Sequence, residues 1–241
     1  NGAGKTTLMN ILYGIYGADE GSIEVNGKPV EIQSPRDALA NGIGMVHQHF
    51  MLVSNFTVAQ NMLLGITDRF WVGLPQVEQE LVELSQRYKL KINPKAKVST
   101  LSVGEQERVE IVKALYRKAE ILILDEPTAV LTPQETEDLF VSLRNLSENG
   151  ISIIIITHKL EEVIAVTDRV TVLRRGKLVD TVHTADITQQ ELANMMVGHD
   201  VKLDIERQPT QVGDTVLEVK DLYCMDAGVN KLNGISLHVK A

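Results

Sequence analysis

The chain has 241 residues, of which 44% are hydrophobic and 23% charged, and its formal net charge at pH 7 is −8. That length can hold one large domain or one and a half, and the acidic balance argues against a nucleic-acid-binding surface, which usually shows an excess of Lys and Arg. The single cysteine, Cys224, excludes an internal disulfide framework and is typical of a reducing compartment, and the most apolar stretch, Ile151–Ile156, is far too short to cross a bilayer.

The chain opens on a glycine-rich segment, Asn1-Gly2-Ala3-Gly4-Lys5-Thr6-Thr7, which matches the second half of the pattern G-x-x-x-x-G-K-[ST]. In such a loop the backbone N–H groups surround a phosphate chain, Lys5 reaches the outer phosphates and Thr6 offers its hydroxyl to Mg²⁺. The following helix would point its N-terminus at the anion. The alternative is an ordinary glycine-rich turn before a helix. Because the first glycine of the pattern would precede Asn1, we expect the chain to be an N-terminally truncated fragment.

Helix-start signals recur along the chain. Ser34-Pro35 predicts an N-cap followed by a proline in the first turn, and Gly42 predicts the end of that helix. Other segments have the Ser/Thr-x-x-Glu/Gln spacing of a capping box, in which side chains at the helix start exchange hydrogen bonds with its backbone. These segments are Thr57–Gln60, Ser102–Glu105, Thr132–Glu135 and Thr188–Glu191.

Two of the expected helices have a readable apolar face. Residues three or four positions apart lie on one side of a helix, so apolar residues at that spacing predict the side that packs on the core. The first set is Val77, Leu81, Leu84 and Tyr88. The second set follows Thr132 and consists of Leu139, Leu143 and Leu146, with Gly150 ending the helix.

Short runs of branched apolar residues between the helices predict strands. Residues 121–124 and 151–156 have the composition of strands buried on both faces, as in a parallel sheet. Residues 170–173 and 178–182 flank a short polar segment and predict a hairpin. Alternation of strands and helices at this spacing predicts an α/β fold with a mainly parallel core sheet.

The region 199–215 changes character. It is polar, contains Pro209 and Gly213 and lacks helical periodicity, so we interpret it as a linker. After it, residues 216–219 alternate like a strand and residues 234–239 resemble another. We therefore predict a first domain at 1–198 and the start of a second domain at 216–241.

Two carboxylates directly follow the apolar strand at 121–124. Asp125 and Glu126 would lie at the carboxyl edge of a parallel sheet, where ligands bind in such folds. Asp125 suits the Mg²⁺ shell, and Glu126 suits general-base activation of an attacking water. The alternative is a solvated acidic pair at a strand end with no chemical role.

Further polar residues are candidates for the same site. His158 follows the next predicted strand and could bind a phosphate oxygen or hold a water, although it could equally cap the helix that begins near Leu160. The Gln48 amide could touch Mg²⁺ or the attacking water. His47 and His49 have the spacing of a metal-ligand pair, but they lack Cys or His partners nearby, so we do not predict a metal site there.

A second helix start could also face an anion. Ser102 is the expected N-cap, and Gly104 lies in the first turn of the helix, about twenty residues before Asp125 in the sequence. The alternative, a capping box with no ligand, explains the local pattern equally well.

Taken in order, these motifs resemble the nucleotide-binding domain of an ABC transporter. The resemblance rests on the phosphate loop, Gln48, Leu-Ser-x-Gly at 101–104, Asp-Glu-Pro-Thr at 125–128 and His158, and it covers the whole chain. It implies a P-loop ATPase with a helical subdomain and antiparallel β elements beside the parallel sheet. It also implies that ATP and Mg²⁺ bind.

The resemblance implies a role for each motif residue. Asn1 to Thr7 correspond to the Walker A loop, and Thr6, Gln48 and Asp125 to Mg²⁺ ligands. Glu126 completes Walker B, and His158 matches the switch histidine. Ser102 and Gly104 match the signature motif, which binds the nucleotide held by a second domain. Gln48 would also lie near the surface that meets the membrane subunit.

Variations in these motifs resemble the fused, two-domain ATPases of bacterial sugar importers. The signature has Val103 and Glu105 where Gly and Gln are common, and Thr132 replaces an aspartate. The segments 44–53 and 126–134 are most similar to the branch that imports nucleosides through a lipoprotein-type binding protein. Residues 216–241 resemble the opening strands of a second ATPase domain. Glu105 is expected to place a carboxylate near a phosphate-facing loop, and Thr132 to weaken a contact between domains.

The resemblance also implies partners and a location. We expect membrane permease subunits, a second ATPase domain of the same full-length protein or a second copy, and indirectly a substrate-binding lipoprotein, but no nucleic acid. The expected location is the cytoplasmic face of the plasma membrane. The alternatives are a soluble ATPase of the same family that acts in translation or DNA repair, and a non-catalytic binding module. The short linker argues against the first alternative, and the intact Lys5, Asp125, Glu126 and His158 argue against the second.

Overall fold

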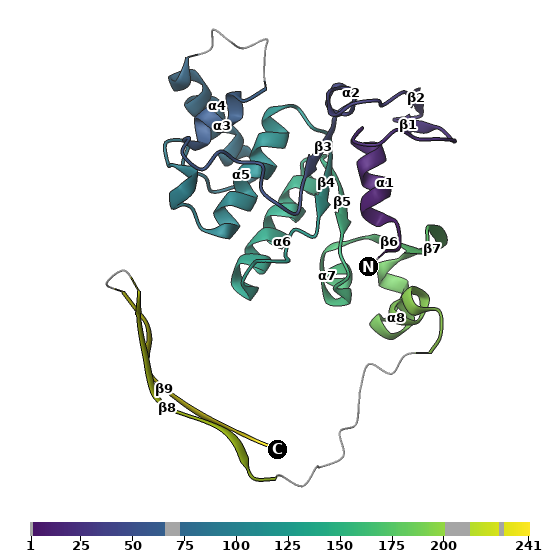
Figure 1. Cartoon of the computed structure of the whole chain (residues 1–241). Coiled ribbons are helices and arrows are strands. Elements are labelled where there is room, and N and C mark those ends of the chain that lie inside the picture. The colour runs from purple at the N-terminus through teal and green to yellow at the C-terminus, as the bar shows by residue number, and fades with distance from the viewer. Residues whose placement is uncertain (1, 66–72, 201–212, 227–228) are drawn as a thin grey trace. The chain divides into compact units, whose positions relative to one another are not determined.

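The computed structural model describes residues 2–65, 73–200, 213–226 and 229–241. The chain divides into two compact units, residues 1–201 and 202–241, each described by itself below (Figure 1). The predicted linker at 199–215 lies mostly outside the described residues. The domain boundaries at residues 198 and 216 therefore remain predictions.

The centre of the first unit is a parallel sheet. Its strands are β3 (Ile43–Val46), β4 (Ile121–Asp125) and β5 (Ser152–Ile156), in the order β3-β4-β5. Met45 is paired with Ile123, which is paired in turn with Ile154. The prediction of an α/β fold with a parallel core is confirmed.

Alternate residues of this sheet pack on opposite layers of helices. One face, with Met45 and Ile123, packs against α1 (Lys5–Leu12) and α2 (Pro35–Ala40). The other face, with Leu122 and Leu124, packs against α5 (Val103–Tyr116) and α6 (Pro133–Glu148). Side chains of neighbouring strand residues point to opposite faces, so a sheet covered on both sides needs apolar residues at every position.

The prediction that residues 151–156 are buried on both faces is wrong. Only Ile151 and Ile156 are buried, Ser152 is exposed, and the residues between them are half-buried. The physical reason is that β5 has β4 as its one sheet neighbour among the described strands, so it forms an edge of the sheet. β4, which has a neighbour on each side, is buried from Leu122 to Asp125.

The predicted helix starts are confirmed. Each of the capping boxes has both its hydrogen bonds, and the helices that they begin are α3 (Val58–Leu63), α5, α6 and α8 (Gln189–Val197). Ser34 Oγ accepts a hydrogen bond from the backbone N–H of Asp37 at the start of α2. A cap needs only residues close in sequence, which explains why the pattern predicts it well.

Helices α3, α4 (Leu74–Tyr88) and α5 lie together on one side of the sheet (Figure 1). Val77, Leu81 and Tyr88 of α4 are buried, and Leu84 packs half-buried beside them. The equivalent residues of α6, with Leu146 fully buried, also face the core. This group of helices corresponds to the helical subdomain that the family resemblance implies.

Two antiparallel hairpins complete the strands of the first unit. One is β1 (Ile23–Val25) with β2 (Lys28–Val30), and the other is β6 (Arg169–Arg174) with β7 (Lys177–His183). Arg175 and Gly176 turn the second hairpin with φ values of 51° and 74°, as a two-residue hairpin turn requires. The remaining elements are α7 (Leu160–Val166) and two 3₁₀ helices, Val98–Thr100 and Thr184–Asp186.

The second unit is a two-stranded antiparallel hairpin of β8 (Thr215–Asp226) and β9 (Val229–Lys240). The strands predicted at 216–219 and 234–239 are present but much longer than expected. Their apolar side chains, such as Leu217, Met225 and Val239, are exposed.

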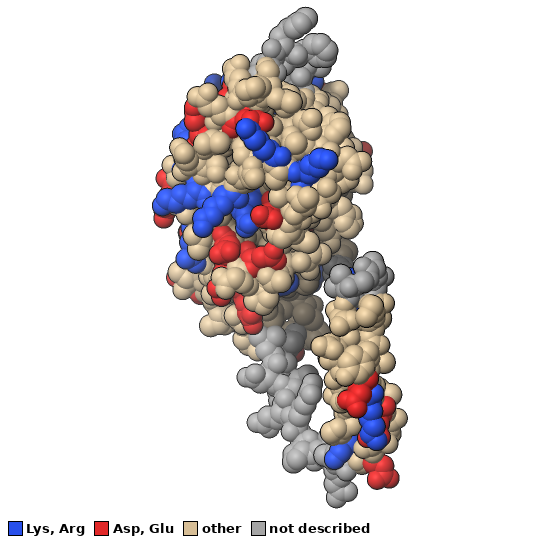
Figure 2. Space-filling view, turned by 90° about the vertical axis from the view of Figure 1, so that its left-hand side faces the viewer, with Lys and Arg blue, Asp and Glu red and all other residues tan. Residues whose placement is uncertain are grey.

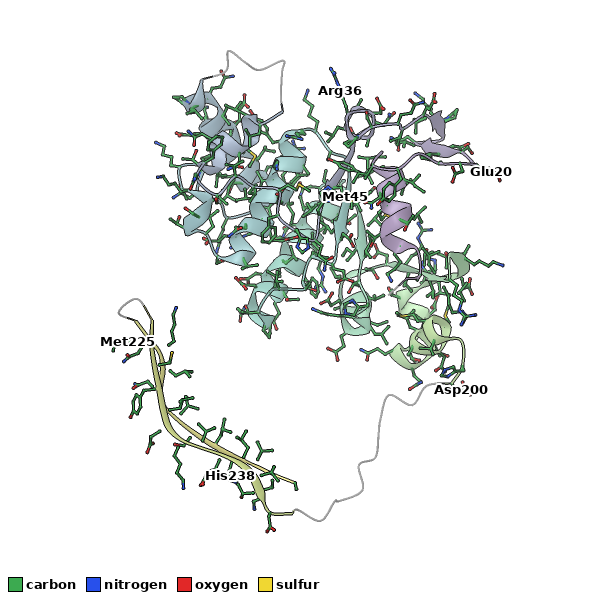
Figure 3. All side chains as sticks on the ribbon, in the orientation of Figure 1. Glu20, Arg36, Met45, Asp200, Met225 and His238 are labelled. Atoms are coloured by element: carbon green, nitrogen blue, oxygen red, sulfur yellow. The ribbon has the colours of Figure 1, made fainter. Side chains whose placement is uncertain are left out.

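The outer surface of the chain carries charges of both signs. On the face seen in Figure 2, Lys and Arg side chains lie beside Asp and Glu side chains. In the first unit Glu20 and Arg36 point outward, whereas Met45 lies inside, and in the hairpin Met225 and His238 are labelled at opposite ends (Figure 3). Within the described part of the chain, no helix has both the length and the apolar character needed to span a membrane.

Candidate functional site

The glycine-rich loop has the backbone conformation that the phosphate-loop prediction requires. Gly2 and Gly4 have φ values of 81° and 94°, a region that residues with a side chain rarely adopt. Gly4 is the N-cap of α1 and bears no capping side chain, so the first backbone N–H groups of the helix remain available to an anion. The loop is held to the β6–β7 turn by a hydrogen bond from Gly176 N to Ala3 O of 3.0 Å. Asn1 lies outside the described residues.

The first turn of α1 places the predicted phosphate-binding side chains. Lys5 is half-buried, and Thr6 and Thr7 are exposed. The Thr6 hydroxyl lies close enough to the Asp125 carboxylate to lower its pKa. Residues 119 positions apart in the sequence therefore meet at one point, and their oxygen atoms are of the kind that Mg²⁺ prefers.

Asp125 is the last residue of β4 and is paired with Ile156 at the end of β5. It thus lies at the carboxyl edge of the parallel sheet, as predicted. Burial raises the pKa of the Asp125 carboxyl above its usual value, and the charge of Glu126 raises it further. The nearby hydroxyl of Thr6 and the positive charge of Lys5 oppose these effects. A bound cation would act in the same direction as Lys5 and favour the ionised carboxylate.

Glu126 has an unusual backbone conformation, with a φ value of 51°. Its N–H donates to Ile156 O at 2.9 Å, and its carbonyl oxygen accepts from Ala129 N at 3.1 Å. A residue other than glycine is strained in this region and needs its surroundings to hold it there. The turn directs the side chain of Glu126 away from the strand and toward the loop that follows β5.

The carboxylate of Glu126 contacts the imidazole of His158. Glu126 Oε1 and His158 Nδ1 are 3.1 Å apart, and the side chains are 21% and 55% exposed. Lys159, not His158, is the N-cap of α7, so the alternative in which His158 caps that helix is wrong. The structure therefore brings Thr6, Asp125, Glu126 and His158 to one edge of the sheet, which we call the sheet-edge cluster.

Ser102 and Gly104 lie at the start of α5 and form a separate cluster. The carboxylate of Glu135, in the first turn of α6, accepts from Ser102 Oγ at 3.2 Å and from Gly104 N at 3.3 Å through the same oxygen. A Cβ atom on Gly104 would lie only 2.8 Å from that oxygen, so the close approach needs a glycine. We call these three residues the signature cluster.

Glu105 was expected to place a carboxylate near the phosphate-facing loop, and in the structure that carboxylate is paired. It accepts a hydrogen bond from the Ser102 backbone N–H at 2.8 Å, which completes the capping box. The carboxylate that accepts from Ser102 Oγ and Gly104 N is that of Glu135. Hydrogen bonds from the Thr132 backbone and hydroxyl lower the pKa of Glu135, and those from Gly104 and Ser102 contribute further. Glu135 was recognised in the sequence only as a capping residue of its own helix.

Gln48 is exposed and lines an open groove of about 440 Å³ together with Phe50, Val103 and Gln106. Among the described residues, Gln48 makes no hydrogen bond to Thr6 or Asp125, so its role as a magnesium ligand stays a prediction. The groove joins the segment after β3 to the start of α5.

The same segment is attached to the middle of α5 by two ionic side chains. Glu110 Oε1 accepts from Met51 N at 2.6 Å, and Lys113 Nζ donates to Met51 O at 2.8 Å. Nearby, His47 packs edge-to-face on Tyr13 with ring centroids 5.6 Å apart, and burial lowers the pKa of His47. The sequence pattern indicated neither contact, because both join residues far apart in the chain.

Comparison with known sequences places these motifs in context. The family described as "ABC transporter" matches residues 1–129. The nucleoside import ATP-binding protein NupA of Lactococcus lactis subsp. cremoris is 52% identical over 244 residues, which cover 100% of this chain and 48% of the relative. The guanosine import ATP-binding protein NupO of Bacillus subtilis is 48% identical with the same coverage, and the glucose import ATP-binding protein TsgD13 of Haloferax volcanii is 46% identical, covering 100% of this chain and 49% of the relative. The chain thus spans about half the length of the curated relatives it matches.

Comparison with solved structures gives the same fold. A nucleotide-free ATP-binding cassette from an ABC transporter matches with a TM-score of 0.68 and 26% identity, covering 82% of this chain and 81% of the other. The structure of cbiO1 from Clostridium perfringens, part of an ABC transporter complex, matches with a TM-score of 0.66 and 28% identity, covering 82% and 78%.

Proposed function

The chain belongs to the ABC transporter family of ATP-binding proteins, and from this membership we propose that it binds and hydrolyses ATP to drive uptake of a solute through a membrane permease. The observation that carries the proposal is the sheet-edge cluster. The Thr6 hydroxyl lies close to the Asp125 carboxylate, and Glu126 and His158 lie in contact next to them. A phosphate loop, a cation site and a base are the parts that hydrolysis of a nucleoside triphosphate needs.

The phosphate-binding residues are those of the glycine-rich loop. We infer that the backbone of Asn1, Gly2 and Gly4 surrounds the phosphates, with Lys5 on the outer ones and Thr7 in the first turn of α1. Thr6, Asp125 and Gln48 would hold Mg²⁺, which would neutralise the charge of the phosphates when bound. The neighbouring oxygens of Thr6 and Asp125 fit such an ion.

Glu126 is the general base of this proposal. Its carboxylate is partly exposed at the end of the sheet, so it can accept a proton from a water that attacks the terminal phosphorus. With Nδ1 of His158 donating to Glu126, the imidazole fixes the direction of the carboxylate. Nε2 can bind a phosphate oxygen only when it also carries a proton, because a phosphate oxygen accepts hydrogen bonds and does not donate them.

The signature cluster completes a second site rather than this one. We infer that Ser102 and Gly104 bind the phosphates of a nucleotide held by a second ATPase domain, either in the same protein or in another copy. Their donors stand at the N-terminus of a helix of 14 residues, whose partial positive charge favours an anion.

The partner in the membrane would be a permease. The open groove beside Gln48 offers Phe50 and Val103 to a partner, and Met51, 64% exposed, lies on the segment that Glu110 and Lys113 attach to α5. We propose that this groove faces the permease at the cytoplasmic face of the membrane and that a binding lipoprotein delivers the solute. The names of NupA and NupO favour a nucleoside as the solute, whereas other relatives import glucose or ribose.

Substitution of Lys5 tests the nucleotide site. In the complete protein that carries this chain, Lys5→Ala removes a charge-assisted contact to phosphate, so affinity for a fluorescent ATP analogue should fall about 10- to 100-fold. The exposed Lys28 in β2 provides a matched control, because Lys28→Ala removes the same charge away from the loop. Equal affinities of Lys5→Ala and the unaltered protein would contradict the proposed site.

Purification from membranes tests the partner. The tagged complete protein should copurify with a permease, and vesicles containing both should take up a radiolabelled nucleoside when ATP and the binding lipoprotein are supplied. Copurification with ribosomes or DNA-repair proteins instead would support a soluble role and contradict the transport proposal.

A further inference from the structure

A buried carboxylate beside the sheet-edge cluster has no part in the proposed chemistry. Glu162 lies in the first turn of α7 and is 7% exposed, whereas the adjacent Glu161 is exposed. Taking a carboxylate out of water is costly unless hydrogen-bond donors surround it. The partners of Glu162 therefore indicate why it is buried.

The partners come from the two loops that carry the proposed catalytic residues. Thr128 Oγ1, two residues after Glu126, donates to Glu162 Oε1 at 2.5 Å. Thr157 Oγ1, next to His158, donates to Glu162 Oε2 at 3.0 Å. One carboxylate thus joins the loop after β4 to the loop after β5, with one oxygen for each.

Lys159 closes the network on its other side. Its Nζ is 2.9 Å from Glu162 Oε1 and donates to the carbonyl and hydroxyl oxygens of Thr128, both at 3.0 Å. Its backbone N–H donates to Thr157 Oγ1 at 3.0 Å. Of the residues on either side of His158, Lys159 therefore bonds Thr128 directly, whereas Thr157 is joined to Thr128 through Glu162.

The strained backbone of Glu126 needs such support. The left-handed conformation at φ 51° is held on the N-terminal side by the bond to Ile156 O. On the C-terminal side, Thr128 is the residue whose side chain is fixed, and Glu162 and Lys159 fix it. Without these bonds the loop after β4 could relax, and the Glu126–His158 contact of 3.1 Å would be lost.

We propose that Glu162 is a positioning residue for ATP hydrolysis. Through its hydrogen bonds to Thr128 and Thr157, it keeps the side chains of Glu126 and His158 in contact with each other. The inference rests on the proposed function. Glu162 is buried and bonds to Thr128, Thr157 and Lys159, so its proposed action passes through these residues. It acts on the rate of the chemical step and leaves nucleotide binding by the glycine-rich loop intact.

The test compares three variants of the complete protein assembled with its permease. Glu162→Ala should lower kcat for ATP about 10- to 100-fold, with KM changed less than about 3-fold, because displacing a reacting group costs rate rather than binding. Glu162→Gln keeps the volume, and Thr hydroxyls can turn to pair with its amide, so it should recover kcat to within about 5-fold of the unaltered protein. Glu161→Ala, the matched control on the same helix, should behave as the unaltered protein.

A purely structural role predicts a different pattern. It would lower the melting temperature of Glu162→Ala but leave kcat per folded molecule unchanged, and that result would overturn the proposal. If Glu162→Ala does not fold, Thr128→Val and Thr157→Val remove one link each while preserving shape. Either valine variant should lower kcat without raising KM, and normal kcat in both would also overturn it. An unaltered protein that hydrolyses no ATP would overturn the proposed function and this inference together.

Discussion

The sheet-edge cluster and the signature cluster differ in what they offer a nucleotide. At the sheet edge, the N-terminus of α1 has no capping side chain, and the Glu126 and His158 side chains are partly open to solvent. At the start of α5, the corresponding donors are already paired with Glu135. One of the two proposed phosphate sites is open, and at the other the donors are bonded to a carboxylate of the same chain.

This contrast shows how hydrogen-bond donors at a helix start can be paired when no ligand is bound. Backbone and hydroxyl donors at a helix start attract any oxygen anion, and a carboxylate is the nearest substitute for phosphate that a protein can supply. Glu135 is held in place by its own capping box with Thr132, so the substitute is available whenever α6 is folded. A phosphate must displace it at the start of α5 but meets no such competitor at the start of α1.

The largest expected effect concerns the sheet-edge cluster. Glu126→Gln removes the proposed base but keeps its shape, so ATP hydrolysis should slow about 10²- to 10⁴-fold. The steady-state rate of phosphate release measures this, and a titration with ATP should show that binding is retained. Glu148→Gln, at the exposed end of α6, is the control. An unchanged hydrolysis rate in Glu126→Gln would show that Glu126 is not the general base.

A second expected effect concerns the helix that carries the signature cluster. Glu107 of α5 is 3% exposed, and burial, reinforced by the charge of Glu110, raises its pKa to about 8 from 4.5. The folded protein therefore binds this proton more tightly than the unfolded chain does. Stability contributed by the neutral group is present at low pH and is lost as the pH rises from about 4.5 toward 8. Above that range the folded state must hold a buried charge.

Glu107→Gln should abolish this dependence. The variant keeps a neutral side chain at every pH, so at pH 8 it should be more stable than the unaltered protein by on the order of 3 kcal/mol. Thermal melting at pH 6 and pH 8 measures the change, with the exposed Glu137→Gln as the control. If the two variants shift equally, the α5 helix does not depend on the protonation of Glu107.

The smallest expected effect concerns the signature cluster, whose donors are paired with Glu135. Glu135→Ala frees Ser102 and Gly104, so the half-saturating ATP concentration for hydrolysis should fall about 2- to 5-fold, because no carboxylate has to be displaced. Glu191→Ala is an unusually close control, since Glu191 caps α8 through the same bonds to Thr188 but touches no anion site. Both variants should have a slightly lower melting temperature than the unaltered protein. Equal ATP dependence in the two variants would show that Glu135 does not compete with phosphate.

The sequence allowed the helix starts and the sheet-edge cluster to be predicted. A capping box such as Thr132–Glu135 is complete within four residues, so its pattern is visible in the sequence alone. Asp125 and Glu126 were located because a short apolar strand ends at them, and in a parallel sheet such ends meet at one edge. Thr6 was placed with Asp125 because the phosphate-loop pattern and the strand-end pattern each assign a residue to Mg²⁺.

The contacts that close or support the two clusters were not predictable in this way. Glu135 reaches Gly104 across 31 positions, and Glu162 reaches Thr128 across 34. The contacts that these two carboxylates make depend on how α6 and α7 pack on the sheet. A local sequence pattern does not predict that packing. The half-burial of β5 was missed for a similar reason, since composition does not reveal how many neighbours a strand has.

The backbone at Glu126 has a consequence for how this protein changes over generations. A left-handed residue with a full side chain costs about 1–2 kcal/mol, whereas Gly or Asn adopts that conformation more readily. Selection for heat resistance alone would therefore favour replacing the one carboxylate that the proposed reaction cannot spare. A lineage that keeps Glu at this position would therefore retain the proposed base at a cost to the stability of its fold.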